Sequence, residues 1–258
     1  MNTRNIRSLF TAAYFLLVWS PFSVFAADDT IEQKLNVARN LLQAKACPEV
    51  ITVLDDVVAG SVATPAQLAI AHDLRRVAFF NQTQPKQAYE ASAESVKYQR
   101  QVTNGHEFLS EILAARAWHA DQEQDYAEAN RCYREAALLQ PRNGTFLNNL
   151  AWHLACCPDP SFHDGILAIH YATQSNTLSQ FDVPGHIDTL AAAFARAGRY
   201  SEAIAFQEKA IAHPKFLENR TPDSVKDFAR RLQNYRDQTP HTDRRPQTPV
   251  IIDTTTDK

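Results

Sequence analysis

Apolar residues recur every three or four positions along most of the chain, and glycine and proline divide this pattern into segments. After Thr30, for example, Ile31, Leu35, Ala38 and Leu42 fall on one face of a helix. Most segments are roughly 12 to 18 residues long, which is typical of globular helices. None shows the sustained alternation of apolar and polar residues that marks a strand. The pattern therefore predicts an all-α protein.

The predicted helices fall into successive pairs joined by short turns. Thr30 opens the first helix, and Gln33 completes a capping-box pattern with it. Thr64-Pro65 and Thr221-Pro222 are similar starts. The helical domain is expected over residues 27–237 and the last helix, as a cap, over 222–236. Residues 238–258 are rich in threonine, proline and charge without apolar periodicity, so a disordered tail is expected there.

A spacing of 30 to 45 residues between pairs indicates a repeat protein. The segment from His186 to Ala212 carries the clearest pattern: a small residue late in the first helix, an aromatic three positions on, glycine and tyrosine at the turn, and two alanines in the second helix. These are Leu190, Ala191, Phe194, Gly198, Tyr200, Ala203 and Ala210. A second segment repeats the pattern with Tyr126, Ala129, Tyr133, Ala136 and Pro141, and a third follows it less closely with Leu150, Ala151 and Ala168.

These residues resemble the tetratricopeptide repeat, most clearly over 110–142, 144–178 and 184–214. Residues from 148 to about 240 also look like exported bacterial proteins of this kind. The resemblance implies a right-handed α-solenoid of about five helix pairs, closed by the last helix. Alanine has a physical role in such a fold, because two helices that cross at close range leave no room for a long side chain between them.

The resemblance also implies a concave groove that holds an extended peptide or a partner's helix. Transferring the family's register places eight residues in this groove: Glu111, Trp118, Asp121, Asn148, Asn149, Trp152, Asp188 and Arg196. Two exposed indoles would be strong binding anchors. The alternative is that both tryptophans are core residues packed between helices. The three carboxylates in the set would favour a basic peptide.

The N-terminus has the layout of a secretory signal peptide over residues 1–26. Arg4 and Arg7 precede an apolar stretch of 11 residues, and Val24 and Ala26 are small residues before a cleavage site at Ala27. Without the leader, 24 basic residues face 29 acidic ones, a net charge of −5. We therefore expect an exported, periplasmic or secreted protein with no affinity for nucleic acid and no later membrane span.

Four cysteines remain after the leader, in a compartment that would be oxidising. A disulfide between Cys132 and either Cys156 or Cys157 is the pairing to test, because the helices that carry them should touch; the alternative is that all four are buried thiols. His153, Cys157 and His163 offer three ligands for a metal, but their spacing matches no structural zinc signature, so neither a metal nor a cofactor is expected.

No nucleophile elbow, phosphate-binding loop or paired-carboxylate motif is present in the sequence. The main hypothesis is a non-catalytic scaffold or adaptor of the cell envelope that binds a protein partner. The alternatives are a structural subunit of an envelope assembly and, with less support, a metal or redox protein that uses the Cys/His cluster.

Overall fold

The computed structural model describes residues 30–218 and 220–243. The predicted signal peptide and residues 244–258 of the predicted tail lie outside the described residues. Within the described ranges the regular secondary structure is all helix, with no strand. The helices are α2 (Ile31–Gln43), α3 (Cys47–Ala59), α4 (Pro65–Asn81), α5 (Pro85–Gln99), α6 (His106–Gln122), α7 (Tyr126–Leu139), α8 (Gly144–Cys156), α9 (Gly165–Leu178), α10 (Pro184–Arg196), α11 (Tyr200–Ile211) and α12 (Pro222–Arg236). The predicted all-α class is confirmed.

Local sequence explains where several of these helices begin. The Thr30 and Thr64 hydroxyls accept hydrogen bonds from the backbone N–H three residues on, and a glutamine side chain there reaches back to the threonine backbone. Thr221 accepts in the same way from Ser224. Each cap satisfies N–H groups that have no partner inside the helix.

The turn inside each pair shows that the N-terminal pairs are built like the others. Lys45, Thr83, Gln124 and Gly198 each adopt a positive φ between the two helices of a pair. The N–H of the following residue then bonds to the carbonyl five residues earlier, as Ala46 does to Leu41 and Arg199 does to Phe194. This is the Schellman ending of a helix. The α8–α9 turn differs, since a short 3-10 helix, Pro160–Phe162, lengthens it.

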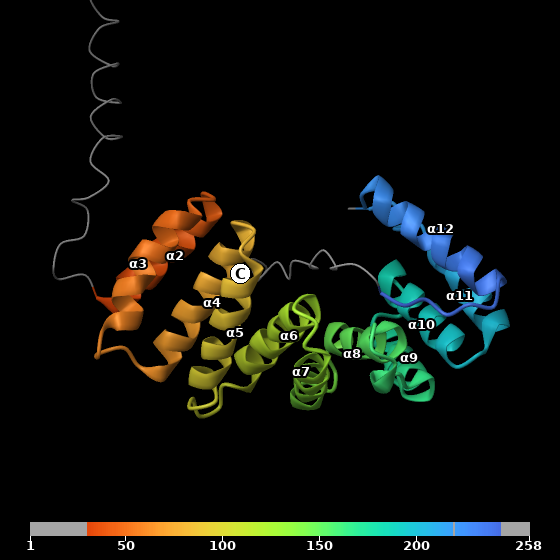
Figure 1. The fold of residues 1–258 in the computed structure, drawn as a ribbon, viewed down its shortest axis with the longest axis horizontal. Helices are drawn as coiled ribbons and strands as arrows, with labels where there is room; N and C mark the ends of the chain where they lie inside the picture. The colour runs from red at the N-terminus through yellow and green to blue at the C-terminus, as the bar shows by residue number, and fades with distance from the viewer. Residues whose placement is uncertain (1–29, 219, 244–258) are drawn as a thin grey trace, which may run out of the picture.

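The eleven helices of the described ranges form an arch, with α2 and α3 at one end, α12 at the other, and α6 to α8 in the middle (Figure 1). Consecutive helices pack side by side, and α2 also contacts α4 as α8 contacts α10. Stacking of this kind lets neighbouring pairs share one apolar core.

Small residues lie where the helices approach one another. Ala129, Ala191, Ala203 and Ala210 are all completely buried, as the sequence predicts. Gly165 shows the same constraint at the start of α9. A Cβ atom there would lie 2.7 Å from the backbone nitrogen of Ala197 at the end of α10, so no larger residue fits.

Helix α12 is fixed to the end of the stack by a buried ion pair. The Arg231 guanidinium donates to both Asp188 carboxylate oxygens of α10, at 2.8 Å each, and Gln207 Nε2 of α11 donates to Asp188 at 2.7 Å. Asp188 is only 4% exposed. Its prediction as a groove residue is therefore wrong, because α12 covers the part of α10 where the family's register would place open groove.

The chain continues as an ordered segment beyond α12. Residues 238–243 run without helical structure from the end of α12 back across α10 to α8, on the inner side of the arch (Figure 1). The sequence prediction of disorder for these six residues is wrong. They lack an apolar pattern, and they are ordered by polar contacts with α8 and α10.

We predict that leucine at a buried alanine destabilises the fold. Ala203→Leu should lower the free energy of unfolding by about 1–3 kcal/mol, because the added methyl groups have no space between the helices. Ala205→Leu, on an exposed position of the same helix, should leave it nearly unchanged. Chemical denaturation followed by circular dichroism measures both. Equal stability of the two variants would contradict the role given to alanine.

We also predict that Arg231→Met destabilises the chain by about 3 kcal/mol or more, because it leaves the Asp188 carboxylate buried without its cation. The neighbouring Arg230→Met removes only an exposed pair with Asp227 and should cost less than about 1 kcal/mol. Thermal and urea unfolding of both variants make the comparison. A loss of similar size for both would show that the buried pair does not secure α12.

Candidate functional site

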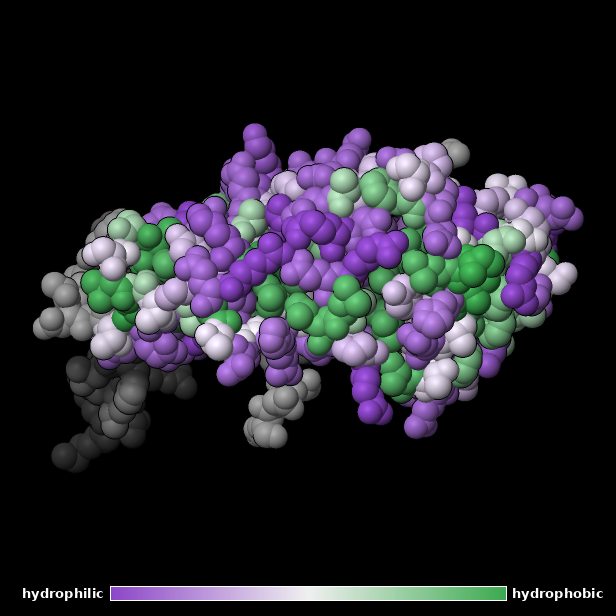
Figure 2. All heavy atoms as spheres, turned by 90° about the horizontal axis from the view of Figure 1, so that it is seen from below, coloured by the Kyte–Doolittle hydropathy of each residue, from purple (hydrophilic) through white to green (hydrophobic). Residues whose placement is uncertain are grey.

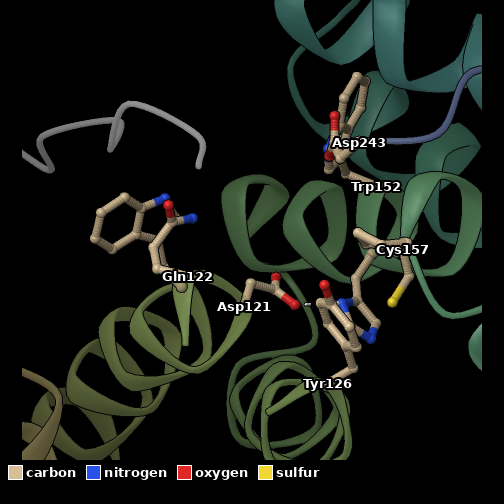
Figure 3. Close-up of a pocket in the computed structure, with 9 residues that line it drawn as sticks. Asp121, Gln122, Tyr126, Trp152, Cys157 and Asp243 are labelled. Atoms are coloured by element: carbon tan, nitrogen blue, oxygen red, sulfur yellow. Dashed lines mark hydrogen bonds and ion pairs between the residues drawn. The ribbon is translucent and has the colours of Figure 1, made fainter. Parts of the chain in front are cut away.

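A small pocket opens on the inner side of the arch, where the C-terminal end of α6 faces α8 (Figure 3). It joins three of the predicted groove residues, Trp118, Asp121 and Trp152. Figure 3 shows Asp121 and Gln122 on the α6 side and Trp152 with Asp243 on the α8 side. The remaining wall residues are Tyr126, His153, Cys157 and Pro158.

The α8 side of the pocket is occupied by the chain's own C-terminal segment. The Trp152 indole Nε1 donates to Asp243 Oδ2 at 2.5 Å, and the Asp243 backbone N–H donates to the Cys156 carbonyl at 2.8 Å. The His241 ring lies against the indole, with ring centroids 5.8 Å apart. Trp152 is thus half-buried, and its side chain contacts the C-terminal segment.

Arg196 joins this site through the same segment. Its Nε donates to the Ala155 carbonyl at 2.5 Å, which fixes the guanidinium against the end of α8. Its Nη2 donates to the His241 carbonyl at 2.7 Å and to Thr242 Oγ1 at 3.0 Å. Arg196, a predicted groove residue, therefore binds a non-helical segment partly through the backbone of that segment.

The α6 side of the pocket has polar atoms without partners. Trp118 is half-buried and packs edge-on against Phe80, with centroids 5.2 Å apart. Trp118 Nε1 and Gln122 Oε1 have no hydrogen-bond partner within the described part of the chain. Since unpaired buried polar groups are costly, a donor and an acceptor left in this state are suited to bonds with a ligand.

Asp121 contributes less to the groove than its position suggests. Its carboxylate lies 3.2 Å from His153 Nδ1, and it also bonds to the buried Tyr133 hydroxyl. Burial, together with the charge of Asp121, raises the pKa of Tyr133 well above its ordinary value. The carboxylate is therefore engaged inside the protein.

Three other predicted groove residues do not line this pocket. Glu111 is half-buried on α6, and its burial, followed by the charges of Glu107 and Asp73, raises the pKa of its carboxyl. Asn148 and Asn149 are half-buried at the middle of α8. Asn148 Oδ1 is buried without a hydrogen-bond partner among the described residues.

The cysteines are buried thiols. Cys47, Cys132, Cys156 and Cys157 are all free, so the structure does not contain the disulfide proposed between Cys132 and Cys156 or Cys157. Cys132 Sγ instead lies 3.5 Å from Glu128 Oε1 of its own helix. Burial raises the pKa of both Cys132 and Cys157 to about 12, which keeps these thiols protonated and poorly nucleophilic.

The side chains of the His/Cys cluster point to other partners. His163 Nε2 lies 2.6 Å from the Cys157 carbonyl oxygen rather than its thiol, while His153 pairs with Asp121. Over the described ranges, no three His, Cys, Asp or Glu side chains are arranged to hold a metal ion.

Sequence reasoning missed Gln122, Tyr126 and Asp243. Gln122 lies four residues after Trp118, on the same face of α6, so the helical period alone was enough to add it. Asp243 is 91 residues from Trp152 and carries no local signal of its position.

Comparison with known proteins adds information about the fold. No protein-family model matches the sequence, and no curated protein matches it. None of the helices within the described ranges has the length and apolar character needed to cross a bilayer.

Solved structures do resemble the chain. MamA from Desulfovibrio magneticus RS-1 has a TM-score of 0.56 at 12% identity, over 75% of this chain and all of the other. A Podosopora anserina putative kinesin light chain with nearly identical TPR-like repeats has a TM-score of 0.56 at 15% identity, over 70% of this chain and 93% of the other. Pseudomonas aeruginosa pilF has 0.52 at 17%, over 80% and 90%. At these identities the likeness concerns the fold, which is the α-solenoid of tetratricopeptide repeats.

Proposed function

We propose that the chain is a non-catalytic protein–protein interaction scaffold of the cell envelope, and that it binds a peptide segment on the inner face of the arch. The observation that carries this proposal is the segment at residues 240–243, which lies on that face against Trp152 and Arg196. A surface that already holds four residues of its own chain has the shape and bonding groups for a peptide.

An extended partner fits this surface better than a helical one. The Cys156 carbonyl accepts a backbone N–H from the bound segment, and Arg196 donates to a backbone carbonyl. A helix uses these backbone groups internally, whereas an extended peptide leaves them free for a partner.

The two tryptophans are the expected anchors. Trp152 already contacts a bound segment, and Trp118 has its Nε1 directed to no partner among the residues described. Large aromatic side chains with one polar atom dominate many binding surfaces, because they bury much area and lose little conformational entropy.

The charge of the groove gives no support to the basic partner expected from sequence. Asp188 is paired with Arg231 beneath α12, and Asp121 is bonded to His153 and Tyr133. Arg231 therefore neutralises one of the three carboxylates on which that expectation relied, and a second, Asp121, already has partners inside the protein. The net charge of −5 without the leader still disfavours nucleic acid as the partner.

We predict that the groove tryptophans are needed to capture a partner. In-cell crosslinking followed by purification should recover at least tenfold less of the main partner with Trp118→Ala or Trp152→Ala. Matched controls are Leu138→Ala and Ile166→Ala, whose side chains are 76% and 73% exposed on other helices. If both tryptophan variants keep every partner, the groove is wrongly assigned. If only the control variants lose partners, the chain acts instead as a structural subunit through those exposed residues.

We predict that the chain is exported and cleaved before Ala27. Mass spectrometry of protein purified from its native cell should show an N-terminus at Ala27. Arg4→Glu combined with Arg7→Glu should reduce the processed form, because the leader needs its positive start. A predominant intact chain beginning at Met1 would contradict the envelope location and leave the binding groove untouched.

A further inference from the structure

The C-terminal segment is held on the groove mainly by polar contacts. Four hydrogen bonds join residues 241–243 to the groove: two involve Asp243, with Trp152 and Cys156, and two run from Arg196 Nη2 to His241 and Thr242. Within the segment, His241 Nε2 lies 3.1 Å from Asp243 Oδ1. Only the His241 side chain is buried, whereas Pro240, Thr242 and Asp243 are half-buried.

This attachment differs from that of α12, the element that precedes it. Helix α12 buries Phe228, Arg231 and Tyr235 in the fold, so it is part of the core. The segment after it buries little apolar surface and can leave the groove without exposing that core. A segment held by contacts of this kind can be replaced in the groove by another peptide.

The groups that hold the segment also select a charge. An indole N–H bonds more strongly to a carboxylate than to a neutral acceptor. Close by, the bonds that Arg196 makes to Ala155, His241 and Thr242 all go to neutral oxygens, so they do not cancel its positive charge. The Arg231 guanidinium lies 5.4 Å from the centre of the Trp152 ring, although Asp188 neutralises it.

We propose that the partner is an extended peptide that presents an acidic side chain to Trp152 Nε1 and, two residues earlier, a backbone carbonyl to Arg196, and that residues 240–243 hold this place in the free protein. The proposal rests on the proposed function and specifies the ligand of the same groove. A partner then binds by displacing a segment of the chain, which lowers its apparent affinity in proportion to the fraction of molecules with an open groove.

The short link between α12 and the segment explains why few contacts are enough to keep the segment in the groove. Residue 240 follows the end of α12 at Arg236 by four positions, so the segment is always close to the groove. Its effective concentration is then high, on the order of millimolar for a short linker, and a free peptide must compete with it.

The test uses the full chain and a fluorescent peptide of residues 238–243 with a capped C-terminus, measured by fluorescence polarisation. The chain with His241→Ala and Asp243→Ala should bind this peptide at least tenfold more tightly than the unmodified chain, because its own segment no longer competes. Thr239→Ala is the matched control, since Thr239 is exposed and its hydroxyl donates to the nearby Asp237 carbonyl. It should bind the peptide as the unmodified chain does.

Two further arms identify the acidic contact. A peptide with alanine in place of Asp243 should bind the opened chain at least tenfold more weakly, and Trp152→Phe added to the opened chain, which removes the donor and keeps a ring, should give the same loss. If circular dichroism shows that the double variant is unfolded, the single Asp243→Ala chain carries the comparison.

Equal affinity of the opened and unmodified chains, or equal binding of the alanine peptide, would overturn the proposal. Failure here is distinguishable from failure of the scaffold function. If the peptide binds no chain while crosslinking through Trp118 and Trp152 still captures partners, the scaffold stands and the segment is only structural.

Discussion

The distance at which two helices can cross depends on the side chains between them, and in this chain those side chains are repeatedly methyl groups. Completely buried alanines lie on α7, α10 and α11, and Gly165 meets the backbone at the end of α10 where no Cβ fits. Close crossings bring whole helix faces into contact, so each pair buries its apolar surface against the next. The arch and its inner face follow from this repeated geometry (Figure 1).

The inner face is not uniform along the arch, because α12 changes its C-terminal part. Arg231 reaches under the surface to Asp188 and at the same time lies over the Trp152 ring. The cap therefore removes one carboxylate from the groove and supports one of its indoles. The next residues of the chain then return to that indole through Asp243. The capping helix and the proposed binding surface are thus parts of one arrangement in this solenoid.

The outer side of the arch offers a contrast. Figure 2 shows it as a surface where hydrophobic residues are interspersed with hydrophilic ones. Leu138 on α7 and Ile166 on α9 are large apolar side chains that are mostly exposed within the described part of the chain. The inner face differs in that it is observed with a peptide segment in place.

Local patterns in the sequence predicted the helices, their pairing and the buried alanines, because helical period, caps and small residues each act over a few positions. The same patterns placed Trp118, Asp121 and Trp152 together, since equivalent positions of stacked repeats lie side by side. They failed for Asp188, because its partner Arg231 is 43 residues away on a helix outside the repeat pattern. They failed again for residues 238–243, whose order depends on contacts with Arg196, 45 residues before His241, and with Trp152, 91 residues before Asp243.

These failures share a physical cause, which also underlies the proposal of an acidic rather than a basic partner. The repeat register predicts which face of a helix a residue lies on. It does not predict which charged side chains pair with an opposite charge from elsewhere in the chain. Asp121 lies beside His153, and Asp188 forms an ion pair with Arg231, so both carboxylates have partners inside the protein. The indole N–H groups and Arg196 are the donors that remain at the groove, and they bind acceptors. The C-terminal half of a groove counted as acidic from its sequence therefore presents hydrogen-bond donors, and this supports the proposal of an acidic ligand.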